Sequence, residues 1–573
     1  MNIFKYYEQL FKKIIKANTN LLGVNNTSSI KNLTVETPPP NYNFDISSNA
    51  AMILAKENKL NPKLVAEKLI KILKENVNEF EQITIEGPGF LNFKLNDKKK
   101  MEFIETILTL EDNFGKLQRN SKINLEYVSA NPTGPLHVGH CRGAIFGDVL
   151  ANILSFCGFQ VTREYYVNDY GNQIFNFVNS IFYRIKEIKD KSPFPKQPDL
   201  YPGEYIIDIA KKIVELDKAN INLDIKTDFN KLKDLSLRFS LDLIKKDLAD
   251  LNIVHNNFVS ETKLVEEKLV DKTIQFLTKK ELVKNDFLDP PKGEEKKNWK
   301  KIKRLVFKSS LFGDDTDRAL TKDDGSWTYF ASDIAYHYDK ILRNPDQLIN
   351  ILGADHAGYI KRISSAVSAL SEKKLELVCK ICQLVKLYKD GKPFKMSKRA
   401  GDFITAQDLL NEVSVDNIRF IMLSRSNDVE IEFDFKKVIE KNKDNHVYYI
   451  QYANARINSV LNQSNHKMND KIDLINSKVE FNDYDKAIIK KIFEWPKIIE
   501  TSATKLEPHK IPYYLYDLAN LFHSYWTAGT KNPKYKFNQE NSITPNALIS
   551  IILVKNVIKL GMNLLGVSLP KKM

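Results

Sequence analysis

Two histidines, His137 and His140, end a segment with two prolines and two glycines, residues 129–140. The segment lies between an expected strand at 122–128 and an expected helix at 136–156. At a helix N-terminus, backbone N–H groups and the helix dipole favour a bound phosphate. Gly139 has no side chain, so a flat base could approach the backbone closely. The pattern indicates a nucleotide site. Zinc binding is one alternative, although further ligands at suitable spacing are lacking; a structural helix cap is the other.

A second cluster of chemically useful residues lies much later in the chain, in the expected loop 392–402. Lys395, Ser397 and Lys398 stand close together there, between glycines and a proline. Such a loop can move, and lysines suit the negative charge that builds on a leaving pyrophosphate. Taken alone this cluster is a weak indication, because lysine runs are usually solvated.

Together and in this order, the two segments resemble the His-Ile-Gly-His and Lys-Met-Ser-Lys-Ser motifs of class I aminoacyl-tRNA synthetases. Val138 replaces the isoleucine, and Arg399 stands where many members have the second serine. The resemblance implies that His137, His140, Lys395 and Lys398 are catalytic. It also implies an ATP-binding set, namely Gly134, His137, Gly139, His140, Lys395, Met396, Ser397 and Lys398.

Further segments resemble the arginyl-tRNA synthetase family in particular. In the middle of the chain these are residues 126–134, 165–174, 328–337 and 353–359. The flanking regions contribute residues 87–93, 448–457 and 564–573. The resemblance therefore covers the whole chain, and it implies tRNA contacts at Tyr449, Tyr452 and Arg456.

The arginine substrate that this resemblance implies carries a planar, always charged guanidinium, which is best held by carboxylates. Tyr329 and Asp333 are four residues apart at an expected helix start, so they share a face. The resemblance implies that both contact the guanidinium, while Glu126 adds negative charge. It places Ser129 and Asn131 at the α-amino end and adds Asp355 to the site. The alternatives are a helix N-cap for Asp333 and a core aromatic for Tyr329.

Three regions are expected to position these residues. Residues 1–115 are predicted to be an α+β module, with helices at 1–15, 50–57 and 64–76 and a strand at 81–86. Residues 116–435 show an α/β pattern, with strands at 122–128, 305–308, 347–352 and 375–385, as a doubly wound parallel sheet of the Rossmann type requires. Within them, about 175–300 is Lys-rich and predicted to be a mostly helical connective insertion. Residues 436–573 show helices at 437–461, 483–502, 511–526 and 547–565 and no strand pattern, which predicts an all-α bundle.

Composition narrows the class of protein. The net charge of +14 suggests a polyanionic partner such as nucleic acid, although solvated lysines alone would give the same value. Cys379 and Cys382 form a C-x-x-C inside an apolar run, so buried thiols are favoured over zinc. No secretory signal is expected at residues 1–15. Lys555 and Lys559 interrupt the apolar stretch near residue 550, which predicts a core helix and no membrane partner.

We therefore expect an arginine-tRNA ligase: a cytoplasmic, monomeric enzyme that uses ATP, accompanied by Mg²⁺, to join L-arginine to tRNA(Arg). Relatives specific for valine, leucine or isoleucine carry a large editing domain, for which residues 141–329 leave no room. A cysteine enzyme would need more zinc ligands. A non-catalytic tRNA-binding paralogue would have lost members of the two motifs, and a small-molecule nucleotidyltransferase would not need the C-terminal bundle.

Overall fold

The structure is a computed structural model, and it describes residues 2–39, 42–216, 225–287, 302–394, 404–463, 479–539 and 542–573. The N-terminal module is α+β, as expected. Its antiparallel sheet has the strand order β1-β2-β4-β3, and α1 begins at Asn2, whose side chain accepts a hydrogen bond from the Phe4 N–H at 3.0 Å. Its elements are α1 (Ile3–Ala17), α2 (Thr19–Leu22), η1 (Ser28–Asn32), β1 (Val35–Glu36), β2 (Ile46–Ser48), α3 (Ala50–Asn58), α4 (Pro62–Asn76), β3 (Phe80–Glu86), β4 (Phe90–Leu95), α5 (Asp97–Leu110) and η2 (Glu111–Asn113).

A five-stranded parallel sheet forms the centre of the molecule, with the order β12-β11-β5-β6-β7. Counted along the chain these strands run 3-2-1-4-5, which is the doubly wound order expected. The strand order reverses between β5 and β11, and in such sheets ligands bind in the crevice at this point. The strands are β5 (Lys122–Glu126), β6 (Gln160–Val167), β7 (Asn257–Ser260), β11 (Gln347–Gly353) and β12 (Leu377–Cys382).

Helices cover both faces of this sheet. Ile349 and Ile351 belong to the same core as α6 (Val138–Phe156), whereas Leu348 belongs to the core of α12 (Tyr329–Leu342) and α13 (Ile360–Leu370). α6 is buried almost all round, because α15 (Val415–Met422), α19 (Asp483–Thr504) and α21 (Pro545–Leu565) pack against it as well. Its Gly147 has no room for a side chain, since a Cβ there would lie 2.3 Å from the Tyr127 ring.

The predicted insertion at about 175–300 is not one continuous excursion. The chain leaves the sheet through α7 (Asn172–Asp190), α8 (Glu204–Leu216) and α9 (Ile225–Asp250), and returns to it as β7, which pairs with β6. A second lobe follows, with α10 (Glu261–Glu266), α11 (Leu269–Lys279), β8 (Val283–Phe287), β9 (Lys303–Phe307), η4 (Ser309–Phe312) and β10 (Arg318–Ala319). β7 is short and half-buried, so its sequence lacks the apolar run that marks the other strands.

Two strand predictions in this region were wrong about the sheet to which the strand belongs. The strand at 305–308 exists as β9, but it pairs antiparallel with β8 and β10 outside the central sheet. The run at 375–385 was predicted as one strand, and it forms two: β12 in the central sheet and β13 (Val385–Lys389) in another. β13 pairs with β14 (Lys392–Pro393) and β15 (Ile431–Asp434), and α14 (Ala406–Glu412), α15 (Val415–Met422) and α16 (Phe435–Ile439) follow. A continuous apolar run does not reveal where the chain changes sheets.

The C-terminal region is a helix bundle, as predicted, made of α17 (His446–Gln463), α19 (Asp483–Thr504), α20 (Lys510–Lys531) and α21 (Pro545–Leu565). The predicted helix at 437–461 starts later, because the chain breaks after α16 and the Asn445 side chain caps Val438 and Glu440 carbonyls. The bundle also holds a small turn, η6 (Pro533–Tyr535), and two short paired strands, β16 (Asn538–Gln539) and β17 (Ser542–Ile543), that we did not expect. α21 is long and apolar enough to cross a membrane, but most of its residues are buried inside the bundle.

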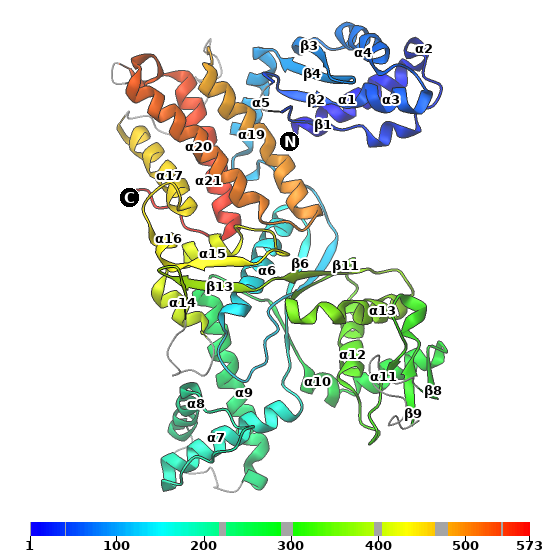
Figure 1. The fold of residues 1–573 in the computed structure, drawn as a ribbon, viewed down its shortest axis with the longest axis vertical. Coiled ribbons are helices and arrows are strands. Elements are labelled where there is room, and N and C mark those ends of the chain that lie inside the picture. The colour runs from blue at the N-terminus through cyan, green and yellow to red at the C-terminus, as the bar shows by residue number, and fades with distance from the viewer. Residues whose placement is uncertain are drawn as a thin grey trace.

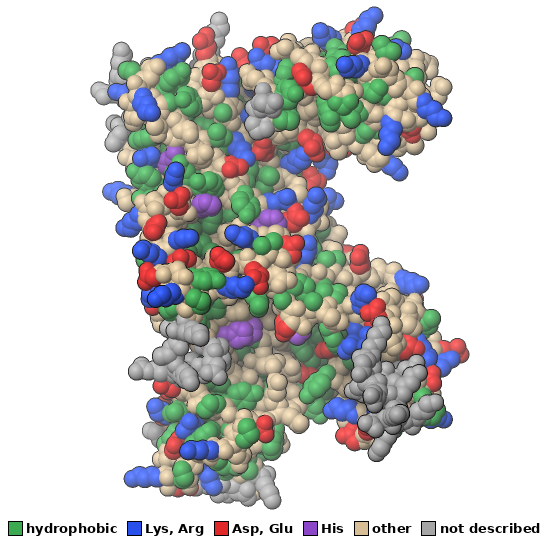
Figure 2. Space-filling view, viewed as in Figure 1, with side chains coloured by type: hydrophobic (Ala, Val, Ile, Leu, Met, Phe, Trp, Pro, Cys, Tyr) green, Lys and Arg blue, Asp and Glu red, His purple; other side chains and the backbone are tan. Residues whose placement is uncertain are grey.

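The N-terminal module packs beside the bundle (Figure 1). Trp495 of α19 donates a hydrogen bond to the Phe114 carbonyl at 3.0 Å, and Phe493 meets Phe103 edge to face. The lobes of α7–α9 and of α10–α13 diverge below the central sheet, and histidine side chains gather where they part (Figure 2).

Candidate active site

The histidine pair lies at the first turn of α6, on the carboxyl side of β5. The His137 and His140 rings stack with their centres 3.7 Å apart, and the His137 N–H donates to Nδ1 of His140 at 3.3 Å. Gly139 makes this possible, because a Cβ there would lie 2.8 Å from Cε1 of His137. Burial lowers the pKa of His137, and burial with His137 lowers the pKa of His140 to about 3. Both rings are therefore neutral at pH 7 and can act as hydrogen-bonding groups.

The predicted lysine cluster, Lys395, Met396, Ser397 and Lys398, lies outside the described residues. The segment after it is joined directly to the histidine segment. The Val138 N–H donates to the Ile404 carbonyl at 2.9 Å, and the Ala406 N–H donates to the Leu136 carbonyl at 2.7 Å. Thr405 caps α14 and lies beside His137 in a short antiparallel bridge. The described residues 404–406, which follow the predicted lysine loop in the chain, thus lie against the histidine segment.

The loop between β5 and α6 has an unusual backbone. Val128 has φ 72° and Ser129 has φ 40°, a left-handed region that a β-branched residue rarely adopts. Ser129 Oγ donates to Glu126 at 2.9 Å and accepts from the Tyr166 N–H at 3.1 Å. Further along, exposed Asn131 donates to Gln173 of α7 at 2.7 Å. The loop is therefore held by side chains on both sides of it.

Both carboxylate oxygens of Glu126 have partners within the protein. One accepts from Ser129, and the other accepts from the ammonium of Lys340 at 2.5 Å. The Lys340 side chain is 0% exposed. The negative charge that we expected Glu126 to add to the site is thus already balanced within the protein.

Asp333 and Tyr329 share a face near the start of α12, as predicted. The N-cap of this helix is Thr328, so the alternative reading of Asp333 as the cap is wrong. Tyr329 is 69% exposed, so it is not a core aromatic. Asp333 accepts a hydrogen bond from the Tyr359 hydroxyl, and burial raises the pKa of Asp333 to about 6.

Glu261 is a carboxylate in this region that sequence reasoning missed. It begins α10, is 6% exposed and lies close enough to Asp333 for their charges to interact. Burial first, and then Asp333 and Asp169, raise the pKa of Glu261 to about 7. Burial first, and then Glu261, Asp333, Glu126 and Asp169, raise the pKa of Tyr166 well above its usual value. Four carboxylates thus lie near Tyr166, and of these Glu126 is already balanced by Lys340.

Asp355 lies on the other side of the crevice, in η5 (Ala354–Tyr359) after β11. Its carboxylate is exposed, lies 3.3 Å from Nε2 of His356 and partly opposes the lowering of the pKa values of His137 and His140. Asp355 therefore lies towards the histidine pair, while the neighbouring His356 lies near enough to Asp333 to act on it, as Glu126 and Lys340 do.

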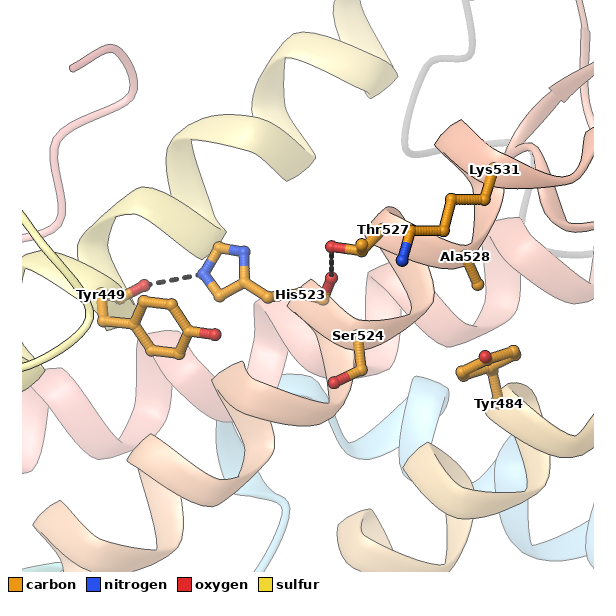
Figure 3. A pocket seen from close by; sticks show the side chains of 7 residues that line it. All are labelled: Tyr449, Tyr484, His523, Ser524, Thr527, Ala528 and Lys531. Carbon is orange, nitrogen blue, oxygen red and sulfur yellow. Dashed lines mark hydrogen bonds between the residues drawn. The ribbon is translucent and has the colours of Figure 1, made fainter.

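The three residues predicted to contact tRNA lie together on α17. Arg456 stacks over the Tyr452 ring at 4.1 Å and over the Trp526 ring at 5.0 Å, and it contacts Nδ1 of His523 at 3.1 Å. Nε2 of His523 in turn contacts the Tyr449 carbonyl at 3.0 Å. A cavity of about 340 Å³ opens beside this cluster, between α17, α19 and α20 (Figure 3). It is lined by Tyr449, Tyr484, His523, Ser524, Thr527, Ala528 and Lys531.

The residues that sequence reasoning missed differ in whether any sequence feature could have pointed to them. Tyr166 and Asp169 fall inside a segment that the resemblance already singled out, so position alone could have suggested them. Glu261 stands among other charged residues of a polar helix, and nothing local distinguishes it. Tyr205 of α8 lies against Gly134, where a Cβ would be 3.1 Å from its ring, and this contact depends on how the lobe folds back.

The cysteines are free thiols. Cys141, Cys157 and Cys382 are buried and Cys379 is half-buried, and burial raises the pKa of each thiol to about 12. Within the described ranges, no group of three or more His, Cys, Asp or Glu side chains is placed to hold a metal ion.

Comparisons with known proteins match the chain in three parts. The arginyl tRNA synthetase N-terminal domain matches residues 7–95, the catalytic domain of class I (R) tRNA synthetases matches 103–463, and the DALR anticodon binding domain matches 450–573. Among curated relatives, the arginine–tRNA ligase of Pelagibacter ubique is 49% identical and that of Bartonella henselae 40%, each covering 100% of both chains.

Solved structures agree with this. A putative arginyl-tRNA synthetase from Campylobacter jejuni is 33% identical with a TM-score of 0.73, covering 84% of this chain and 100% of its own. Thermus thermophilus arginyl-tRNA synthetase, at 18% identity and a TM-score of 0.72, covers 100% of both chains and shows the same fold. With matches along its whole length and the histidine pair at the crevice of its parallel sheet, this chain belongs to the arginyl-tRNA synthetase family of class I aminoacyl-tRNA synthetases.

Proposed function

We propose that this chain activates L-arginine with ATP to arginyl-adenylate and transfers the arginyl group to the 3′-terminal adenosine of tRNA(Arg), releasing AMP and pyrophosphate. The observation that carries the proposal is the crevice between β5 and β11. It has a neutral histidine pair on one side and the carboxylates around Asp333 on the other. A nucleotide and a cationic amino acid would meet there.

ATP occupies the histidine side of the crevice in this proposal, as its Mg²⁺ complex. Gly134 and Gly139 line this side of the crevice and leave room for the Tyr205 and His137 rings, while His137 and His140 donate hydrogen bonds to the α-phosphate. Their depressed pKa values mean that they bind as neutral donors. The positive charge for the leaving pyrophosphate comes from Lys395 and Lys398, with Met396 and Ser397 in the same loop. Support comes from the backbone bonds that join residues 404–406 to 136–138.

Arginine occupies the acidic side. Asp333 accepts from the guanidinium and Tyr329 lies over it, since its ring is exposed and on the same face of α12. Ser129 and Asn131 hold the α-amino end from the strained loop. Glu261 adds negative charge, because it lies near Asp333 on the adjoining helix. Asp355, which we first assigned to arginine, fits better at the junction of the two substrates.

The reaction asks for alignment more than for covalent chemistry by the protein. The arginine carboxylate attacks the α-phosphate in line with the departing pyrophosphate, and the adenosine hydroxyl of tRNA then attacks the activated carbonyl. Holding both substrates in one crevice accounts for much of the rate enhancement. Charge stabilisation of the phosphoryl oxygens supplies the remainder.

The bundle binds tRNA through the surface around Tyr449, Tyr452 and Arg456. Arg456 is already stacked between two aromatic rings, so it presents a rigid cation and π-faces next to an open cavity. A splayed-out base can stack on such aromatic side chains. The N-terminal module, residues 1–115, contacts the same tRNA as the bundle, residues 436–573. The catalytic region, residues 116–435, lies between these two in the sequence. We propose a monomer in the cytoplasm with no membrane partner.

A charging assay tests the proposal. The purified chain should esterify labelled arginine to tRNA(Arg) in the presence of ATP, and His140→Ala should lower kcat by about 10²–10³-fold, the usual loss for one transition-state donor. His509→Ala, at the N-cap of α20 and outside the crevice, is the matched control and should charge normally. The proposal is wrong if the wild-type chain transfers no arginine, or if the two variants lose activity equally.

A further inference from the structure

Glu126 and Lys340 form an ion pair that is buried behind the proposed arginine site. Lys340 comes from the last turn of α12, its side chain is 0% exposed, and its ammonium lies 2.5 Å from a Glu126 oxygen. The ammonium also lies 4.5 Å from the centre of the Tyr336 ring. A buried charge of this kind requires its partner, because removal of either one leaves the other unbalanced.

The pair lies at the point where the strand order reverses. Lys340 also donates to Asn350 of β11 at 3.0 Å, and Asn350 is directly opposite Glu126 in the pairing of β11 with β5. One ammonium thus ties the carboxyl end of β5 to the middle of β11, the two strands that border the crevice. Its position is fixed by three elements: α12, β5 and β11.

The other oxygen of Glu126 holds the loop that carries Ser129. Val128 and Ser129 both have positive φ, and such strain persists only where surrounding contacts impose it. The contacts of Ser129 Oγ with Glu126 and with the Tyr166 N–H are the ones that do so. Without Lys340 on its second oxygen, Glu126 would carry a buried and unbalanced negative charge directly beside this loop.

We propose that Lys340 is a positioning residue for arginine recognition. It neutralises Glu126 and keeps it on Ser129, so that Glu126 shapes the loop and does not bind the guanidinium. The negative charge that the substrate meets then comes from Asp333 and Glu261. The inference rests on the proposed arginine site, which the Asp333→Asn variant tests independently.

Three variants distinguish this positioning role from direct contact between Glu126 and the guanidinium. Lys340→Met and Glu126→Gln each leave one member unpaired, and each should raise the arginine KM about tenfold or more while the ATP KM changes less than about twofold. The double variant Lys340→Met with Glu126→Gln removes both charges, and a glutamine can still accept from Ser129. Its arginine KM should return to within a few-fold of the wild-type value.

Loss of one member of a buried charge pair can also destabilise the whole domain, and a control variant separates that effect from arginine recognition. Arg343→Met is the matched control. It breaks the neighbouring pair at the C-cap of the same helix, with buried Glu164, whose described side-chain partners do not include the loop. Arg343→Met should lower the Tm, but it should not raise the arginine KM more than the ATP KM.

The outcomes decide the question. If Glu126 contacts the guanidinium directly, the double variant will bind arginine no better than Glu126→Gln, and the proposal is overturned. Equal losses for arginine and ATP in Lys340→Met would show a purely structural lysine and would overturn it too. If Lys340→Met does not fold, the comparison of the double variant with Glu126→Gln still decides. Failure of the proposed function would look different, since wild type and Arg343→Met would then not charge arginine.

Discussion

At the guanidinium end of the crevice, Asp333 accepts a hydrogen bond from Tyr359, while the charge of nearby Glu126 is balanced by Lys340. Arginine and lysine are both cations, so charge alone cannot distinguish them. A site with fixed acceptors that match the guanidinium should reject an ammonium, because unfilled buried acceptors are costly.

Asp333→Asn keeps the shape of the side chain and removes its charge. Arginine kcat/KM should fall by about 2–5 kcal/mol, the usual range for truncating one partner of a buried charged pair. The ATP KM should not change, since the nucleotide lies over His137 and His140. Asp339→Asn, two turns further along α12 and paired with Arg343, is the control for effects on the helix. Equal losses for both substrates, or equal losses in both variants, would contradict the role of Asp333.

Arginine binding should depend on pH. The pKa of Asp333 is raised to about 6 and that of Glu261 to about 7, mainly by burial. The guanidinium stays charged and binds the carboxylate forms. As the pH falls through 7 and then 6, both carboxyls gain protons, so the arginine KM should rise while bound arginine lowers both pKa values. Titration calorimetry in buffers of different ionisation enthalpy should detect proton release on binding near pH 6.5. An arginine KM that is flat from pH 5.5 to 8 would contradict this.

At the scale of single residues, the sequence predicted the histidine pair and the shared face of Tyr329 and Asp333, because both depend on spacing within one helix. It could not predict that Lys340 balances Glu126. That contact joins residues 214 positions apart, and no sequence pattern near either residue indicates it. Glu261 was missed for the same reason.

Among the elements, α14 connects the two motifs. Its N-cap residue Thr405 accepts from the Asp408 N–H at 3.0 Å and bonds the Asp408 carboxylate, and its backbone lies beside His137. The lysine segment therefore ends at an element that is fixed to the histidine segment. A helix cap can in this way influence ATP binding.

Thr405→Ala removes the cap and should cost about 1 kcal/mol of stability. Because the bridge to His137 loosens with it, the ATP KM should rise while the arginine KM changes little. Ser414→Ala removes the N-cap of α15, next along the chain, and is the control: Ser414 accepts from the Asn417 N–H at 3.4 Å. Thermal unfolding and both KM values should be measured for each variant. If the ATP KM rises in both variants, or in neither variant, the α14 cap has no specific influence on ATP binding.

Element types were predicted well where the periodicity was long, as in α4, α19 and α21. The errors concern partners. β9 and β13 are strands, as predicted, but the sequence does not say which sheet a strand joins. β7 escaped prediction because it is short and half-buried, although it completes the central sheet.

Across the whole molecule, the bundle surface and the crevice would share one tRNA, with the anticodon end on the bundle and the 3′ end at the adenylate. The N-terminal module packs against α19 through contacts of Trp495, Phe493 and Phe103. Deleting residues 1–115 would expose this apolar contact, so point variants test tRNA binding more cleanly than truncation does.

Arg456→Ala removes the cation stacked between Tyr452 and Trp526. The tRNA KM should rise by the equivalent of about 1–3 kcal/mol, the usual range for losing one stacked base, and the ATP and arginine KM values should not change. Lys510→Ala, at the far end of α20 and paired with Glu507, is the control. An unchanged tRNA KM in Arg456→Ala would mean that tRNA uses another face of the bundle.

The central claim is that this crevice selects arginine and passes it to tRNA. Its most direct test is aminoacylation of total tRNA with each of the twenty amino acids in turn, using the purified chain and ATP. The account predicts charging with arginine alone, with lysine at background. Charging with any other amino acid, or no charging with arginine while the protein is folded, would contradict it.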